Sequence, residues 1–157
     1  MLIENVVNAS DISGEAGGGL VSVSPQTTLL DVSRVLSDSN IGVVMVLEDD
    51  DILVGVLTER DIIAAIAKHG DNALQETAET TMTQDVKTCS PRDNPKDVIN
   101  TMSKGRFRHM PILSGNHLTG LVSATDILMF YMKYANLNDR QVILAIILES
   151  GLVYPGG

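Results

Sequence analysis

Two heptapeptides, GVLTERD at residues 55–61 and GLVSATD at residues 120–126, decide the fold of this chain. Each begins with glycine, has a hydroxyl residue fourth and ends on aspartate. Each follows an apolar run and precedes apolar residues at helical spacing, so Thr58 and Ser123 stand where a helix N-cap belongs. An acid three residues after a hydroxyl N-cap makes a capping box, here with Asp in place of Glu. The two stretches predict equivalent strand-to-helix junctions.

The similarity extends outward from these junctions into an internal repeat. Residues 20–66 can be set over residues 86–131, and an offset of 66 then matches Ser24-Pro25 with Ser90-Pro91. The second copy has one residue fewer in the turn before its heptapeptide, and from there on the offset is 65. The identities are few, but their order and the single gap indicate a duplication.

Each copy predicts the order β-α-β-β-α. A short β run, LVSV or VKTC, ends at Ser-Pro, where proline removes a backbone donor. A helix follows Thr28 in the first copy and Asn94 in the second, with Pro95 at the first helical position. Two short apolar strands and a second helix complete the copy. The expected fold class is α/β (α+β), with two pseudo-symmetric repeats packed face to face, since neither alone has much core, plus a C-terminal helix.

The C-terminal helix is expected over Asn136–Ser150, capped by Asn138 or Asp139 and stopped by Gly151. Its stretch VILAIIL is apolar around much of the circumference, so it must bury against the repeats, a second chain or another partner. A further short helix is expected over Ala73–Glu79. The expected organisation is a lead-in segment (1–19), repeat 1 (20–69), a connector (70–85), repeat 2 (86–135) and a C-terminal helix with tail (136–157).

Composition excludes several classes of protein. The 157 residues are 44% hydrophobic and carry a net charge of −9, which repels nucleic-acid phosphates and anionic lipid. The lone Cys89 fits a reducing compartment, and no apolar run approaches the roughly 20 residues that span a bilayer. The first residues lack the basic and then apolar pattern of a secretory signal. The sequence predicts a soluble, cytoplasmic protein without nucleic-acid or membrane partners.

This order of elements, with GVLTERD and GLVSATD opening the last helix of each copy, resembles the CBS domain family over about residues 20–132. Two copies side by side resemble the CBS pair, or Bateman module. TMTQDV at 81–86 and FRHMPIL at 107–113 also look like stand-alone bacterial CBS-pair proteins of the kind labelled IMP dehydrogenase-related. The resemblance implies a non-catalytic regulatory module that needs no cofactor and binds an adenosine-containing ligand: AMP, ADP, ATP, S-adenosylmethionine or an NAD-type nucleotide. It also implies a homodimer, with an unidentified protein as the regulated target.

The resemblance further implies which residues contact the ligand. In CBS domains that bind adenosine ligands, the matching Asp holds the ribose hydroxyls, and the matching Ser or Thr lies beside the ribose or phosphate. The end of the first strand, the backbone of the middle strand and basic residues on that strand supply the remaining contacts. Carried onto this sequence, the candidates are Ser22, Thr58, Asp61, Thr88, Arg108, His109, Met110, Pro111, Ser123 and Asp126, with Arg60 a weaker phosphate candidate.

The residues themselves leave two interpretations open. Both Ser/Thr-x-x-Asp elements can be helix caps alone, in a ligand-free interaction or dimerisation module. Lys104 and Arg106 are assigned to closing a helix against its dipole. The first copy has no basic residue from Asp38 to Val43, so one occupied site per chain is expected. Neither a nucleophile–base pair nor metal-ligand spacing emerges, so no catalytic or metal site is expected.

Overall fold

The computed structural model describes residues 1–8, 20–49 and 52–152. The chain divides into two compact units. One is built on Leu20–Val86 and is called the first-repeat unit; the other joins the second repeat to both ends of the chain and is called the second-repeat unit. No helix among the described residues is long and apolar enough to cross a bilayer.

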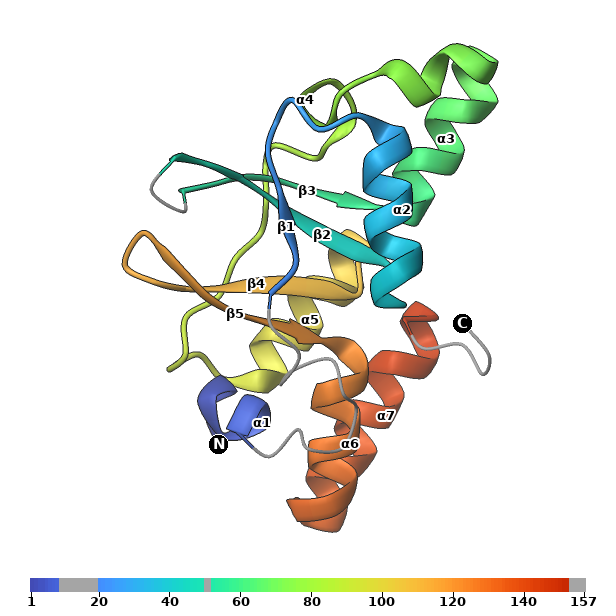
Figure 1. Cartoon of the computed structure of the whole chain (residues 1–157). Helices are drawn as coiled ribbons and strands as arrows, with labels where there is room; N and C mark the ends of the chain where they lie inside the picture. Colours follow the sequence, from blue (N-terminus) through green and yellow to red (C-terminus); the bar gives the residue numbers. More distant parts are fainter. Residues whose placement is uncertain (9–19, 50–51, 153–157) are drawn as a thin grey trace. The chain divides into compact units, whose positions relative to one another are not determined.

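The first-repeat unit has the predicted β-α-β-β-α order (Figure 1). Its sheet has the order β1-β2-β3, with β1 parallel and β3 antiparallel to β2. Apolar side chains of α2, α3, β2 and β3, such as Leu29, Val44 and Leu57, form its core. The elements are β1 (Ser22–Val23), α2 (Leu29–Ser39), β2 (Val43–Glu48), β3 (Ile52–Thr58), α3 (Glu59–His69), the 3-10 helix η2 (Gly70–Gln75) and α4 (Ala78–Thr81).

The connector does not form the single helix expected over Ala73–Glu79; it forms η2 and α4 with an extended break at Glu76 and Thr77. The carbonyl of Glu76 accepts a hydrogen bond from the Leu29 amide at 2.8 Å. The Ala78 amide donates to the carbonyl of Thr27, also at 2.8 Å. This pairing with the start of α2 takes the backbone groups that a continuous helix would have used, which explains the break.

The second-repeat unit contains α5 (Pro95–Gly105), β4 (His109–Ser114), β5 (His117–Ser123), α6 (Ala124–Tyr134), α7 (Leu137–Ser150) and α1 (Ile3–Asn8). Its sheet is the two-stranded hairpin β4-β5. The VKTC run, predicted as a strand, makes only an isolated parallel bridge between Cys89 and Ile112. Cys89 is buried, and burial raises the pKa of its thiol to about 12, as befits a small core residue.

The first helix of each repeat begins as predicted. The Thr28 side chain accepts a hydrogen bond from the Asp31 amide at 3.2 Å, and the Asn94 side chain accepts one from the Lys96 amide at 2.9 Å. Both helices also end alike, since Asn40 and Arg106 occupy left-handed C-cap conformations at matching positions. The local signals at both ends of these helices therefore agree with the tertiary fold.

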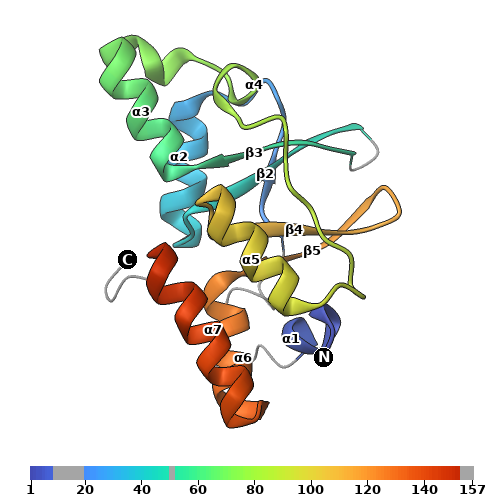
Figure 2. The same cartoon turned by 180° about the vertical axis from the view of Figure 1, so that it is seen from behind.

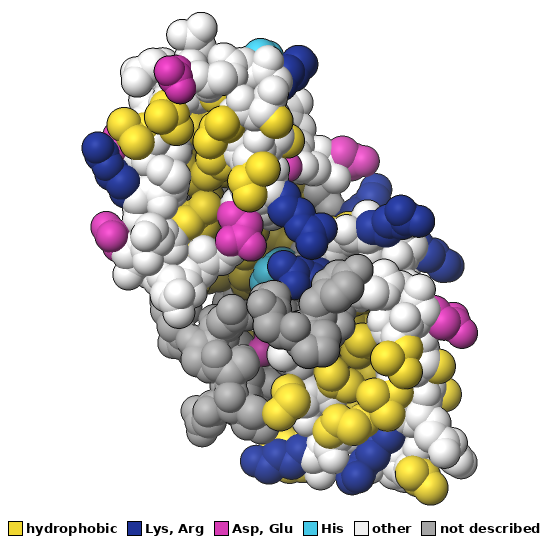
Figure 3. Space-filling model, turned by 90° about the vertical axis from the view of Figure 1, so that its right-hand side faces the viewer, with side chains coloured by type: hydrophobic (Ala, Val, Ile, Leu, Met, Phe, Trp, Pro, Cys, Tyr) yellow, Lys and Arg dark blue, Asp and Glu magenta, His cyan; other side chains and the backbone are white. Residues whose placement is uncertain are grey.

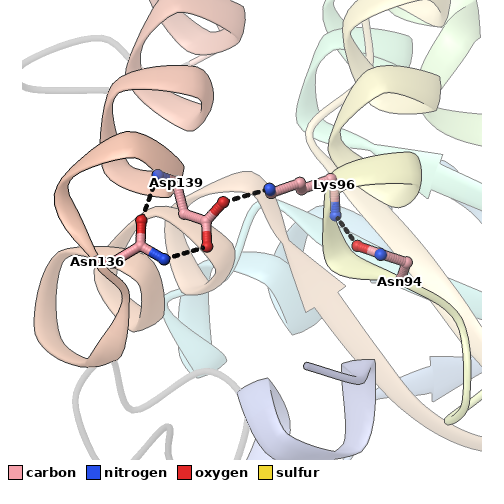
Figure 4. Close-up of polar contacts among 4 residues, drawn as sticks. All are labelled: Asn94, Lys96, Asn136 and Asp139. Carbon is pink, nitrogen blue, oxygen red and sulfur yellow. Dashed lines mark hydrogen bonds and ion pairs between the residues drawn. The ribbon is translucent and has the colours of Figure 1, made fainter.

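The C-terminal helix α7 packs on α5 and α6, with Ile143 and Ile147 buried. Its N-cap is Asn136, not Asn138 or Asp139: the Asn136 side-chain oxygen accepts from the Asp139 amide at 2.9 Å (Figure 4). Asp139 also pairs with Lys96 of α5, and this hydrogen bond lowers the pKa of Asp139 and raises that of Lys96. Asp139 therefore serves as the acid in the first turn and fastens α7 to α5.

The helix α1 was not foreseen from the sequence. It packs on α6, with Ile3 and Val6 almost fully buried in the core of the second-repeat unit. The amide of Ile3 donates to the Asp93 carbonyl at 3.0 Å, and that of Glu4 donates to the Pro91 carbonyl at 2.9 Å. The start of the chain is thus part of this core.

Gly55 permits the connector to cross β3 closely. The amides and carbonyls of Val56 and Thr83 exchange hydrogen bonds of 3.1 and 2.9 Å. A Cβ atom on Gly55 would lie 2.3 Å from the sulfur of Met82 and 3.1 Å from the Thr83 carbonyl oxygen. Glycine is required here by close packing and not by backbone conformation.

Gly55→Ala should therefore lower the free energy of unfolding by roughly 1–3 kcal/mol, because the new methyl group overpacks this crossing. Gly120→Ala is the matched control, since a Cβ there first meets the movable Ile112 Cδ1 at 3.2 Å. Urea unfolding of both variants would measure the difference. Equal losses would contradict the assignment of Gly55 to the crossing.

Candidate functional site

The second helix of each repeat begins with a complete capping box. In the first repeat the Thr58 amide and hydroxyl both donate to Asp61 Oδ2, at 2.8 and 3.0 Å. The Asp61 amide donates back to the Thr58 hydroxyl oxygen at 3.3 Å. The predicted capping role is therefore confirmed for both residues.

The second repeat reproduces this geometry in a more buried setting. The Ser123 amide and hydroxyl donate to Asp126 Oδ2 at 2.8 and 2.7 Å, and the Asp126 amide donates back at 3.1 Å. Ser123 and Asp126 are 4% and 5% exposed, whereas Thr58 and Asp61 are half-buried. A buried carboxylate needs such donors to offset its desolvation.

A second shared contact ties each helix start to the middle strand. The Ala124 amide donates to the Arg108 carbonyl at 2.9 Å, and the matching Glu59 amide donates to the Gly42 carbonyl at 3.0 Å. The strand that carries the basic residues of the second repeat is thereby fixed against the first turn of α6. This contact brings Arg108 and Asp126 to the same end of the unit.

His109, the first residue of β4, shares this environment. Burial and, to a smaller extent, the Arg108 charge lower the pKa of its imidazole to about 4, although the Asp126 charge acts in the opposite direction. His109 is therefore neutral at pH 7, and Arg108 is the permanent cation beside it. The structure thus brings together four of the candidates: Arg108, His109, Ser123 and Asp126. We call this group the second-repeat corner.

The other candidates lie farther along the same elements. Met110 and Pro111 follow His109 in β4 and are buried, and the Pro111 carbonyl accepts a hydrogen bond from the Cys89 amide at 3.0 Å. Thr88 is exposed beside this bridge. In the first repeat, Ser22 lies exposed on β1, paired with Met45 of β2.

The first repeat has an acidic residue close to the position at which the second repeat has Arg108. The repeat alignment places Gly42 at the position of Arg108 and the buried Val43 at that of His109. A Cβ atom on Gly42 would lie 3.5 Å from the Glu59 carboxylate, so this acid stands beside the strand. Sequence reasoning missed Glu59, although its alignment with Ala124 could have signalled it. The equivalent position in the first repeat, around Gly42, therefore has a carboxylate nearby, and this negative charge disfavours the binding of a phosphate group.

Chemically, the second-repeat corner offers hydrogen-bond acceptors, a neutral imidazole and one guanidinium. These groups suit a ligand that has hydroxyl groups and a negative charge. Among the described residues, no three His, Cys, Asp or Glu side chains are grouped closely enough to hold a metal ion.

The depressed pKa of His109 predicts a loss of stability in acid. Between pH 6.5 and about 4 the unfolded chain binds a proton at this residue and the folded chain does not. The free energy of unfolding therefore falls by up to about 3 kcal/mol as the pH falls through this range. His109→Gln should flatten this part of the pH profile, whereas His117→Gln, at an exposed position, should not. Urea unfolding at about pH 7 and about pH 4.5 tests this. Unchanged pH dependence in His109→Gln would contradict it.

Comparisons with solved structures identify the same architecture. The CBS-domain containing protein ATU1752 from Agrobacterium tumefaciens matches with a TM-score of 0.74 and 27% identity, covering 82% of this chain and 91% of that one. The CBS domain pair of protein MJ0100 matches in fold with a TM-score of 0.71 at 20% identity, covering 85% and 97% of the two chains. That structure is a complex with 5′-methylthioadenosine and S-adenosyl-L-methionine.

Sequence comparisons agree. An uncharacterized 17.7 kDa protein of Acidianus ambivalens is 30% identical over 120 residues, which is 76% of this chain and 71% of the relative. The matched regions of three further relatives span only 30%, 36% and 56% of those proteins. The CBS domain model matches residues 16–68 and 78–133. The chain therefore belongs to the CBS domain family and carries two copies of the domain.

Proposed function

We propose that this chain is a regulatory module that binds an adenosine-containing ligand mainly through its second repeat. The observation that carries the proposal is the gathering of Arg108, His109, Ser123 and Asp126 where β4 and α6 begin. The adenosine ligands of the MJ0100 CBS pair, a protein with the same fold, support the choice of ligand class.

Asp126 is assigned to the ribose. A carboxylate in the first turn of a helix can accept two hydrogen bonds from a cis-diol, as acidic residues do in dinucleotide-binding folds. The capping box engages Oδ2 and fixes the plane of the carboxyl group, so this acid is held in one orientation at the start of α6. Ser123 both caps the helix and orients this acid. Capping and ligand binding are then compatible roles of the same two residues.

Arg108 is assigned to the ligand phosphate or another anionic group. A chain of net charge −9 repels anions at long range, so binding one requires a local cation and directed hydrogen bonds. The guanidinium supplies both, and the N-terminus of α6 adds a favourable dipole. His109, neutral at pH 7, contributes hydrogen bonds without charge. The adenine is assigned to the β4 backbone at Met110 and Pro111, with Thr88 at its edge.

The first repeat is proposed to bind a ligand without phosphate or to remain empty. Its Thr58 and Asp61 keep the capping geometry, and Ser22 keeps its strand position. The Glu59 carboxylate stands where the second repeat has a basic strand, and Arg60 alone does not reverse that difference. One anionic ligand per chain follows from this asymmetry.

The biological action assigned to binding is regulatory and not catalytic, in a cytoplasmic setting. A ligand shifts a conformational equilibrium only by its difference in affinity for two states, and the affected target is a separate protein.

The second candidate is a ligand-free interaction module. It is favoured by the capping boxes, which give both aspartates a structural reason to be present.

Thermal unfolding with AMP, ADP, ATP, S-adenosylmethionine, 5′-methylthioadenosine and NADH tests the proposal. A ligand at 100 times its dissociation constant stabilises by about 2.7 kcal/mol, which should raise the midpoint by roughly 5–10 °C. Asp126→Ala should abolish the shift and cost about 1 kcal/mol of stability as a lost cap. Asp61→Ala is the matched control, because it removes the same cap from the first repeat and should leave the shift with the phosphorylated ligands AMP, ADP, ATP and NADH intact.

Arg108→Gln should remove the shift for phosphorylated ligands, while Lys104→Gln, in the exposed last turn of α5, should retain it. Loss of binding in Asp61→Ala with retention in Asp126→Ala would move the site to the first repeat. An unchanged midpoint with every ligand would leave the ligand-free interaction module as the function.

A further inference from the structure

The outer edge of the last strand is paired in the first repeat and open in the second. In the first repeat, the Val56 amide and carbonyl point away from β2 and exchange hydrogen bonds of 3.1 and 2.9 Å with Thr83 of the connector. The repeat alignment places Leu121 of β5 at the position of Val56. Among the described residues β5 pairs only with β4, and no backbone hydrogen bond from another segment reaches Leu121. An unpaired edge of this kind is a template for another strand.

The connector also fills the space at a glycine whose equivalent in the second repeat is more exposed. A Cβ atom on Gly55 would lie 2.3 Å from the Met82 sulfur. Gly120 is the equivalent glycine, and the atoms nearest to a Cβ there belong to Ile112 of the adjacent strand β4. Gly55 is accordingly buried, whereas Gly120 is half-buried. On β5, the more exposed glycine and the open edge are thus neighbours in the chain, as Met82 and Thr83 are in the connector.

The helices of the second-repeat unit cover a face of the β4-β5 hairpin. Figure 2 shows α5, α6 and α7 beside the two strands. Their apolar side chains share one core with Met110 and Ile112 of β4 and Val122 of β5. The side chains of this core come from one face of the hairpin, because successive residues of a strand point to opposite faces. The backbone groups along the outer edge of β5 take no part in it.

The sequence of the chain itself has no equivalent of the methionine for the second repeat. Carried back with the same offset of 66, the repeat alignment sets Ala16 and Gly17 against Met82 and Thr83. Alanine offers far less apolar surface than methionine, and two more glycines follow Gly17. Glycine also loses more conformational freedom than any other residue when it is fixed in a strand. These differences favour a segment of another protein as the partner of the β5 edge.

Other exposed surfaces give no such indication of a partner. Hydrophobic side chains gather at the surface of each unit on the side of the molecule that Figure 3 shows. The exposed apolar residues of α3 and α7 include Ile63, Ile66 and Leu148. Nothing in the described part of the chain indicates what would cover them, whereas the connector shows how the equivalent strand β3 receives an extended segment.

We propose that the β5 edge of the second repeat binds an extended segment of a partner protein, with an apolar side chain such as methionine placed over Gly120. The partner's next residue pairs with Leu121 through its amide and carbonyl, as Thr83 pairs with Val56 in the first repeat. Main-chain hydrogen bonds supply the affinity in this mode of recognition, and the side-chain slot supplies the specificity. The inference goes beyond the proposed ligand and does not rest on it, because neither Gly120 nor Leu121 belongs to the candidate site.

A peptide with the sequence of the connector, ETTMTQDV (residues 79–86), is the probe. It is added to the full chain labelled with nitrogen-15, and the backbone amide signals are followed by NMR. We expect saturable shifts at residues 119–122. At a peptide concentration about ten times the dissociation constant, hydrogen exchange of the Leu121 amide should slow about tenfold. The peptide ETTGTQDV, which lacks the methionine, should bind roughly tenfold or more weakly.

The variant Gly120→Ala tests the slot within the chain. Its methyl group first meets the movable Ile112 side chain, so the fold should persist, but it occupies the space assigned to the methionine of the peptide. Peptide affinity should fall roughly tenfold, whereas Ser114→Ala, exposed at the end of β4, should leave it unchanged.

Four results would each overturn the proposal. The first is the absence of saturable shifts on β5, and the second is equal binding of ETTGTQDV. The third is an unchanged affinity in Gly120→Ala. The fourth is a Leu121 amide already protected from exchange in the free chain, which would show that the chain covers its own edge.

Discussion

The fold of each repeat depends on the junction at which its last strand turns into its last helix. A single aspartate oxygen accepts hydrogen bonds from both the amide and the hydroxyl of the capping residue, in Thr58–Asp61 and again in Ser123–Asp126. The next amide is bound by a carbonyl at the entrance to the middle strand. Three elements are thereby joined at one point. The free amides at a helix start would otherwise need water or a ligand.

This construction separates the scaffold from the chemistry it presents. The hydrogen bonds that hold the junction use backbone groups and the capping pair, so the flanking side chains are free to differ. The second repeat has the Arg108 cation and the neutral His109 beside its capping aspartate, whereas the first repeat has Gly42 at the position of Arg108 and the Glu59 carboxylate beside it. A duplicated unit can in this way keep one fold while its two copies acquire different ligand preferences.

The two repeats also differ in the segments that pack on them from outside the repeat. Both α1 and α7 pack on the second repeat and bury Ile3, Val6, Ile143 and Ile147 there. Each such side chain stabilises by roughly 1.5–3 kcal/mol when fully removed from water. The first repeat gains its extra cover from the connector, through Ala73 and Ala78. The exposed isoleucines of α3 are a consequence of this uneven distribution.

The sequence by itself determined the two repeats, their element order and the caps of their helices. These features depend on residues three or four apart, whose hydrogen bonds and apolar spacing are visible in a linear pattern. The resemblance to the CBS domain family, carried by the capping and strand motifs, pointed to the residues that meet in the second repeat: Arg108, His109, Ser123 and Asp126. The caps at Thr28, Thr58, Asn94 and Ser123 are where prediction and structure agree to the residue.

Only the tertiary structure decided the features that depend on contacts between distant residues. The connector breaks at Glu76 because Leu29 takes its carbonyl, and α7 begins at Asn136 with Asp139 held by Lys96. The VKTC run makes one bridge, and the start of the chain becomes a core helix. In each case the partner lies tens of residues away, so no local pattern could specify the pairing.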